Sequence, residues 1–192
     1  GDSTTSNGGH ILLQQVNVSG TKQLRFRYGH QYNKIQLQAT GLAPNTWQHV
    51  LITYDGGTTG SQSTQINDYY GRFNIFIDGV LTSTSNSHAA FGYNAGIQSD
   101  VFRVGRYSSG NYMRNCKVDE LAVFDSDQSS SVSEIYNGGA PKDLSTLTTQ
   151  PNHWWRMGDG DTYPYLQDSG SAANCVLQMY NMTSANIIND VP

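Results

Sequence analysis

The 192-residue sequence is poor in charged residues, in cysteine and in long apolar runs. Charged residues make up 14% of it, the formal net charge is −4, and no cluster of Lys and Arg is present, which argues against nucleic acid as a partner. No run approaches the roughly 18 apolar residues that a membrane-spanning helix requires, so we expect no membrane insertion. The two cysteines, Cys116 and Cys175, are too far apart for a metal-ligand motif, and their pairing stays open.

Glutamate is also scarce, which limits the enzyme classes that fit. Glycoside hydrolases use two carboxylates across a groove, but the chain has only Glu120 and Glu134. Asp119 and Glu120 are adjacent, and on a strand they point to opposite faces and cannot act together. Neither a Gly-x-Ser-x-Gly elbow nor a phosphate-binding loop with lysine occurs. We therefore expect no enzymatic activity, with catalysis by aspartates alone as the open alternative.

What the sequence does have is period-two alternation of apolar and polar residues, in short segments bounded by Gly, Asn, Asp or Ser. This pattern predicts an antiparallel all-β sandwich of two sheets. In the segment KQLRFR, Leu24 and Phe26 fall on one face, and Gln23, Arg25 and Arg27 fall on the other, which should be wet. The predicted strands are 11–18, 22–28, 33–39, 49–54, 72–78, 101–107 and 117–124.

Turn and helix signals punctuate these strands. Asp78-Gly79 predicts a two-residue hairpin of type I′, which needs a positive φ at both central positions. SSSVSEIYNGG predicts one short helix with Ser131 or Ser133 at its N-cap, Glu134 in its first turn and Gly138 in the left-handed C′ position. Residues 153–171 contain too many turn residues to predict regular structure.

Four segments in order carry a family resemblance: NTWQHVLITYDGG, FNIFIDGVL, FRVGRY and KVDELAVFDSDQSSSVSEIYNGG. Together they resemble the laminin-G-like, pentraxin-like branch of the concanavalin A-like lectin/glucanase superfamily, over about Thr46 to Gly139. The resemblance implies a jelly-roll sandwich, a single domain over 1–192 that lacks its usual first strands, and a recognition or structural module. It places Trp47, Val50 and Ile52 in the core, makes His49 a sheet residue, and makes residues 55–57 a turn.

The C-terminal residues 141–192 have a looser resemblance, to laminin-G-like modules in structural proteins of marine bacteriophages, in the segment HWWRMGDGDTYPYLQDSGS and the final DVP. This implies a C-terminal extension packed on the sandwich. We expect one of Trp154 and Trp155 in the core and the other facing outward or towards a neighbouring chain. It also implies a location on a virion surface or outside the cell. The partners would be cell-surface glycans or neighbouring virion subunits in an oligomer. A capsid or fibre assembly domain without glycan binding remains the main alternative.

Three loops have the composition of a sugar-binding site, in which aromatic rings stack on sugar faces and polar side chains bond hydroxyl groups. Tyrosine is equally at home in strands and interfaces, so a purely structural role for each ring stays open. The candidate residues are Asp68, Tyr69, Tyr70, Arg72, Tyr93, Asn94, Tyr107, Asn111 and Tyr112.

Calcium is the one cofactor left open. It needs roughly six to eight oxygen ligands, and many relatives bind it through loop carboxylates and carbonyls. The candidate ligands are Asp125, Asp127, Asp159 and Asp161, with Asp68 as a further oxygen donor. The favoured alternative is that these aspartates are solvated turn residues.

Overall fold

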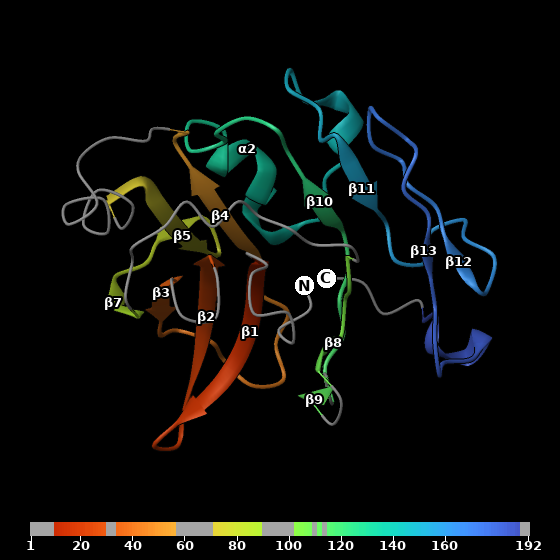
Figure 1. The fold of residues 1–192 in the computed structure, drawn as a ribbon. Helices are drawn as coiled ribbons and strands as arrows, with labels where there is room; N and C mark the ends of the chain where they lie inside the picture. The colour runs from red at the N-terminus through yellow and green to blue at the C-terminus, as the bar shows by residue number, and fades with distance from the viewer. Residues whose placement is uncertain are drawn as a thin grey trace. The chain divides into compact units, whose positions relative to one another are not determined.

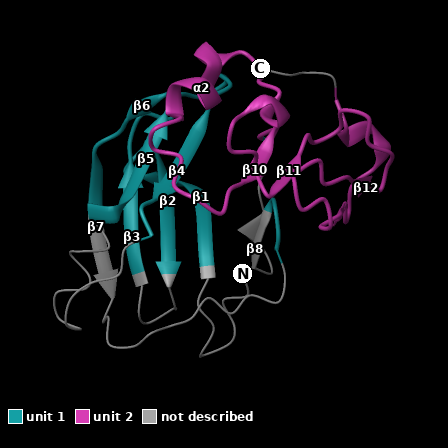
Figure 2. Ribbon diagram, turned by 90° about the horizontal axis from the view of Figure 1, so that it is seen from above, with its two compact units in different colours: residues 1–115 teal, residues 116–192 magenta. Residues whose placement is uncertain are grey.

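The computed structural model describes residues 10–29, 34–56, 71–89, 102–108, 111–112 and 115–188. The chain forms two compact units, residues 1–115 and residues 116–192 (Figures 1 and 2). Among the described residues, no helix combines the length and the apolar character needed to cross a membrane.

Unit 1 is built from antiparallel sheets. The four-stranded sheet has the order β1-β2-β3-β7, the three-stranded sheet has the order β4-β5-β6, and β8 pairs with β9 in a two-stranded ribbon. The bounds are β1 His10–Val18, β2 Thr21–Gly29, β3 Lys34–Ala39, β4 Val50–Tyr54, β5 Phe73–Ile77, β6 Val80–Leu81, β7 Thr84–Ala89, β8 Arg106–Ser108 and β9 Asn111–Tyr112.

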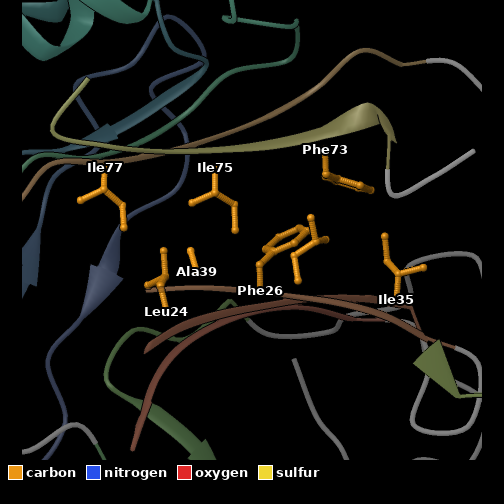
Figure 3. Packing of buried hydrophobic residues seen from close by; sticks show 8 residues of the cluster. Leu24, Phe26, Ile35, Ala39, Phe73, Ile75 and Ile77 are labelled. Atoms are coloured by element: carbon orange, nitrogen blue, oxygen red, sulfur yellow. The ribbon is translucent and has the colours of Figure 1, made fainter. Parts of the chain in front are cut away.

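The two larger sheets of unit 1 pack face to face. Alternate residues of β2, β3 and β5 point into one buried apolar cluster, because successive side chains on a strand point to opposite faces. The buried members are Leu24, Phe26, Ile35, Leu37, Ala39, Phe73, Ile75 and Ile77. Figure 3 shows Phe73, Ile75 and Ile77 of β5 opposite Phe26 and Ile35 of the four-stranded sheet. The predicted antiparallel β-sandwich is therefore confirmed.

Strand β1 differs from its neighbours because its inward-facing apolar residues are exposed. Leu13 pairs with Phe26, and Ile11 pairs with Tyr28, so both lie on the face of the sheet that forms the core. Nevertheless Ile11 is 54% exposed and Leu13 is 48% exposed, and the buried cluster contains no residue of β1. Within the described residues, the second sheet does not cover this edge strand.

The Asp78-Gly79 hairpin between β5 and β6 is confirmed, with φ of 51° at Asp78 and 74° at Gly79. Strand β7 was not predicted, because its sequence TSNSHA has no apolar alternation. It forms by pairing along all six residues of β3, so a neighbouring strand rather than its own composition determines it.

Unit 2 consists of short strands and turns. Its elements are β10 Leu121–Val123, α2 Val132–Tyr136, η1 Asn137–Gly139, η2 Leu144–Thr146, β11 His153–Trp155, β12 Tyr165–Leu166, β13 Leu177–Gln178 and η3 Ser184–Asn186. The predicted helix is confirmed as α2, with Ser131 at the N-cap and Glu134 in the first turn. The Ser131 side chain makes no capping bond. Gly138 is left-handed as predicted, with a φ of 67°, and Asn137 before it is left-handed as well.

Two expectations about unit 2 are wrong. Residues 153–155 form strand β11 paired with β10, although turn residues surround them. Trp154 and Trp155 are both buried, 4% and 2% exposed, so neither ring faces outward. Successive side chains of a strand point to opposite faces, so burial of both rings means that both faces of β11 are covered.

Cys116 and Cys175 are not joined by a disulfide bond.

We expect Ile75→Ala to destabilise unit 1 by about 3 kcal/mol, because it removes buried methyl groups and leaves a cavity. Ile75 is 0% exposed at the centre of the cluster. The matched control is Val80→Ala in β6, where the side chain is 67% exposed and the expected change is within about 0.5 kcal/mol. Urea unfolding of the three proteins measures both values, and equal effects of the two substitutions would contradict this description of the core.

Candidate functional site

The sugar-binding loops predicted from composition fall largely outside the described residues. This applies to Asp68, Tyr69, Tyr70, Tyr93 and Asn94. Arg72 directly precedes β5, and its Nη1 contacts both carboxylate oxygens of Asp55, at 2.9 and 3.0 Å. Since Asp55 follows β4, this ion pair joins the ends of two neighbouring strands. A role of Arg72 in binding stays a prediction.

The third predicted loop becomes the ribbon of β8 and β9. Tyr107 lies in β8, and Asn111 and Tyr112 lie in β9, with Arg106 paired to Tyr112 and Ser108 paired to Asn111. The fold therefore brings these three predicted residues onto one short hairpin. Their role in sugar binding also stays a prediction.

The described residues contain a more extensive polar surface on the four-stranded sheet. It is the side of the sheet opposite the core, and we call it the polar face. Pairing aligns Gln14 with Arg25 and Arg25 with Gln38 in one row, and Arg27 with Gln36 in the next. The polar face is formed by six half-buried side chains, Gln14, Gln23, Arg25, Arg27, Gln36 and Gln38.

Cross-strand hydrogen bonds orient both arginines of the polar face. Arg25 Nε donates to Gln38 Oε1 at 2.9 Å, and Arg27 Nε donates to Gln36 Oε1 at 2.6 Å. A guanidinium group has five N–H donors, so the four on the two Nη atoms of each arginine are not used by these bonds. Each guanidinium group is thus held at Nε, and its Nη atoms make no further hydrogen bond to the described part of the chain.

The polar face has positive charge without a compensating carboxylate from its own strands. None of β1, β2, β3 and β7 contains Asp or Glu. Burial and the neighbouring positive charge of Arg27 lower the pKa of Arg25 from its ordinary value. Both effects disfavour a cation, and attraction to negative or strongly polar oxygens of a ligand would offset them.

Two amide groups on the polar face have unused hydrogen-bonding capacity. Within the described chain, Gln14 Oε1 and Gln23 Oε1 are buried and accept no hydrogen bond. An unsatisfied buried acceptor costs about 1–3 kcal/mol. Rotation of either amide towards a ligand hydroxyl group would recover this cost.

The polar face was only partly visible in the sequence. Alternation in KQLRFR predicts Gln23, Arg25 and Arg27 on a wet face, and the structure confirms that they share one face, half-buried. The cross-strand pairs with Gln36 and Gln38 depend on register, which one strand alone does not reveal. The available signal is that two successive strands, β2 and β3, combine Gln or Arg at alternate positions with a complete lack of acidic residues.

The opening motif of the family resemblance has a structural role. Asp78 Oδ1 accepts from the backbone N–H of His49 at 2.8 Å, and the N–H of Asp78 donates to the carbonyl of His49 at 2.9 Å. Burial lowers the pKa of His49, while nearby Asp78 opposes this. Val50 and Ile52 pack against the core as expected, but Trp47 is half-buried and lies outside the core cluster.

The candidate calcium ligands each have a partner of another kind. Asp127 accepts from the N–H and hydroxyl of Ser129 in a turn, and Asp159 pairs with Arg156 at 2.7 Å. Asp125 accepts from the Asn152 side chain, and Asp161 accepts from the backbone N–H of Gln167. Among the described residues, no group of three or more His, Cys, Asp or Glu side chains is arranged to bind a metal ion. This favours the reading of these aspartates as turn residues.

A shallow depression of about 300 Å³ lies beside β5, between Gly71 and Thr84. Phe73, Asn74, Ile75 and the segment 81–84 line it, and none of these residues is charged. Its lining combines apolar side chains with the hydrogen-bonding side chains of Asn74, Thr82, Ser83 and Thr84.

The family described as the Concanavalin A-like lectin/glucanases superfamily, in its laminin G-like form, matches residues 2–135. The chain belongs to this superfamily. No curated protein and no solved structure matches the chain. Laminin G-like domains of this type are typically binding modules without enzymatic activity.

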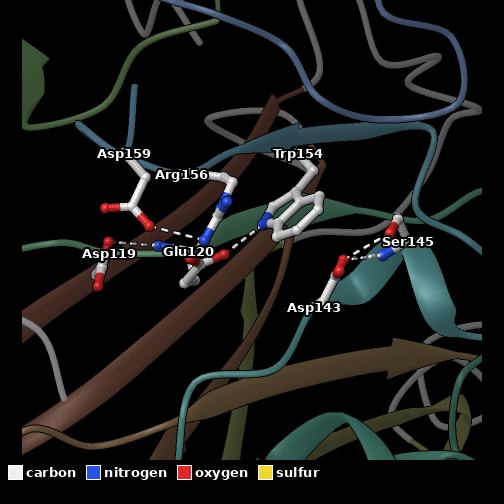
Figure 4. Close-up of polar contacts among 7 residues, drawn as sticks. All are labelled: Asp119, Glu120, Asp143, Ser145, Trp154, Arg156 and Asp159. Atoms are coloured by element: carbon white, nitrogen blue, oxygen red, sulfur yellow. Dashed lines mark hydrogen bonds and ion pairs between the residues drawn. The ribbon is translucent and has the colours of Figure 1, made fainter. Parts of the chain in front are cut away.

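The glucanase side of the superfamily directs attention to Asp119 and Glu120. The expectation that they lie on a strand and point apart is wrong, because β10 begins at Leu121 and Glu120 has a φ of 51°. Burial raises the pKa of both carboxyl groups. Figure 4 shows the two side chains near Arg156.

Both carboxylate oxygens of Glu120 are nevertheless occupied. Trp154 Nε1 donates to Glu120 Oε2 at 2.5 Å, and Arg156 Nε contacts Glu120 Oε1 at 3.4 Å (Figure 4). Arg156 also lies over the Trp154 ring, 5.2 Å from its centroid, and pairs with Asp159. Glu120 thus binds the indole of a buried tryptophan and an arginine.

Asp168 is the main polar anchor of unit 2 and lies beyond the matched residues of the superfamily. Its side chain is 1% exposed and accepts from His153 Nδ1 at 2.6 Å. It also accepts from the backbone N–H groups of Trp154, Gly170 and Cys175. Burial disfavours the charge, but these four hydrogen bonds outweigh it and lower the pKa of Asp168 to about 2.

Asp168→Asn should therefore destabilise unit 2 by about 2 kcal/mol at pH 7. Because the folded-state pKa lies below the usual 3.8, this stabilisation is present above about pH 4 and is lost as the pH falls towards 2. Urea unfolding followed by tryptophan fluorescence is a suitable measurement, since Trp154 and Trp155 belong to this unit. Asp125→Asn, at an exposed carboxylate, is the control with little expected effect. A stability difference that persists unchanged to pH 2 would contradict the role of the charge.

Proposed function

We propose that the chain is a non-enzymatic carbohydrate-recognition module that binds glycans on the polar face. The observation that supports this is the continuous set of amide and guanidinium groups described above, which the core does not use. Amide groups both donate and accept hydrogen bonds, and guanidinium groups donate several, which suits the many hydroxyl groups of a sugar. Leu12 and Val16 flank Gln14 on the same face of β1 and offer apolar contact to sugar C–H groups.

A site on one face of a sheet encloses less of its ligand than a deep pocket does, so each binding event would be weak. Repetition of the module on a particle raises the effective concentration of sites and can increase the overall affinity by 10² to 10⁴. A virion surface or another extracellular assembly provides this arrangement and agrees with the expectation from the C-terminal segment. The partners would then be cell-surface glycans, with Tyr107 and Tyr112 of the β8–β9 hairpin as candidates for additional stacking contacts.

A second candidate function is assembly with neighbouring subunits, and the exposed apolar residues of β1 favour it. Ile11 and Leu13 lie on the core side of the sheet but remain largely uncovered. An edge strand with exposed apolar residues invites pairing with another chain. The two functions are compatible, because β1 presents the polar face on one side and these residues on the other.

The test of glycan recognition is an array of glycans probed with the full chain in multivalent form. We expect selective binding that survives a calcium chelator, because the polar face has no carboxylate from its own strands and the described residues contain no group of three or more side chains arranged to bind a metal ion. Gln14→Ala should weaken binding several-fold by removing one hydrogen-bonding group from the polar face. Gln15→Ala is the matched control, since the adjacent residue on the same strand points to the other side and is exposed.

Three results of the array experiment would count against this proposal. If the chain bound no glycan while control lectins bound theirs, this result would contradict carbohydrate recognition. Equal effects of Gln14→Ala and Gln15→Ala would move the site away from the polar face. Loss of binding in chelator would direct attention to a calcium site instead.

For assembly, we expect the full chain to form an oligomer that Leu13→Lys weakens, because a charge on the edge strand opposes strand pairing and apolar contact. Light scattering over a range of concentrations measures the oligomeric state. Val80→Lys introduces the same charge at an exposed apolar position of the other sheet and should leave the oligomer intact. A monomeric wild-type chain would exclude this second candidate.

A further inference from the structure

The charges on the polar face point to a particular class of glycan. Arg25 and Arg27 are two residues apart on β2 and therefore lie on the same face, with about 7 Å between their positions along the strand. We propose that this face selects acidic polysaccharides and that each arginine binds a uronate carboxylate. This inference rests on the proposed carbohydrate recognition and narrows it to one class of ligand.

The hydrogen bonds of the arginines leave the correct edge available for a carboxylate. In each case Nε is bonded to a glutamine oxygen of β3, Gln38 for Arg25 and Gln36 for Arg27. The two Nη atoms of a guanidinium group donate in parallel and match the two oxygens of a carboxylate. Gln36 and Gln38 are therefore positioning residues, because they orient the donors without any requirement to touch the ligand.

The placement of the two arginines favours a polymer over a single acid. A polysaccharide with a carboxylate on successive residues can contact both guanidinium groups at once, whereas a monosaccharide can contact one. The amide groups of Gln14 and Gln23 lie on the same face, and rotation would turn their buried, unsatisfied Oε1 atoms towards sugar hydroxyl groups. The polar face thus combines arginine donors for the carboxylates of a polysaccharide with amide groups for its hydroxyl groups.

The electrostatic balance of the face supports an anionic ligand. The four strands contribute no carboxylate, and the two like charges on neighbouring rows repel each other. Both side chains are half-buried, so solvent screens them less than fully exposed charges. Two arginines on a chain of net charge −4 are too few for a nucleic-acid surface, which usually neutralises many phosphates.

The experiment compares polygalacturonate with its carboxyl-reduced, neutral counterpart as ligands of the full chain. Biolayer interferometry with immobilised polymer gives the affinities, and each is measured at low and high salt. We expect at least about tenfold tighter binding of the acidic polymer, with the preference falling as salt rises. A single-stranded oligonucleotide of similar charge serves as a nonspecific polyanion.

The variants separate charge from geometry. Arg25→Gln and Arg27→Gln should each weaken polygalacturonate binding about tenfold or more and leave binding of the neutral polymer nearly unchanged. Arg25→Lys retains the charge but loses the parallel pair of donors, so it should recover only part of the affinity. Lys22→Gln is the matched control, because it removes the same charge from the same strand on the opposite side of the sheet.

Circular dichroism and thermal unfolding establish that each variant is folded. Equal binding of the acidic and neutral polymers, with Gln14→Ala still harmful, would overturn the acidic preference and leave carbohydrate recognition intact. Binding of the oligonucleotide as tight as that of polygalacturonate would also overturn it. Absence of binding to any glycan would overturn the proposed function together with this inference.

Discussion

The pairing register of the four-stranded sheet is the constraint on which the rest of unit 1 depends. Side chains alternate between the two faces of a strand, so a slip of one residue would move every core residue to the outside. Burial of Leu24 and Phe26 against β5 therefore fixes Arg25 and Arg27 on the outer face. The same register brings Gln38 beside Arg25. Burial of the apolar residues on the inner face therefore determines which polar residues become neighbours on the outer face.

Unit 2 depends on polar contacts more than on a broad apolar core. The charge of Asp168 is stabilised by donors from three separate segments, which include β11 and the turns around Gly170 and Cys175. Trp154 and Trp155 are buried on the two sides of the same short strand, and each indole N–H has an acceptor. These buried hydrogen bonds stabilise the short strands of unit 2, because a conformation that broke one would leave a buried polar group without a partner.

The sequence predicted features that depend on local chemistry and missed those that depend on partners. Alternation predicted the sandwich, and Asp78-Gly79 predicted its hairpin, because both signals are contained in a few consecutive residues. Strand β7 escaped prediction, since its polar residues become a strand only beside β3. The same holds for the polar face, where the alternation was visible but the glutamine partners of the arginines were not. Glu120 was misplaced because its positive φ, unusual for glutamate, has no local sequence signal.

The alternation of inner and outer residues on β2 and β3 also has an evolutionary consequence. An outer side chain can change without altering the packing of its inner neighbours, because the two sets contact different surroundings. Substitutions at exposed outer positions can therefore accumulate at little cost in folding stability. A sandwich of this kind can diversify the molecules it recognises while its interior stays the same.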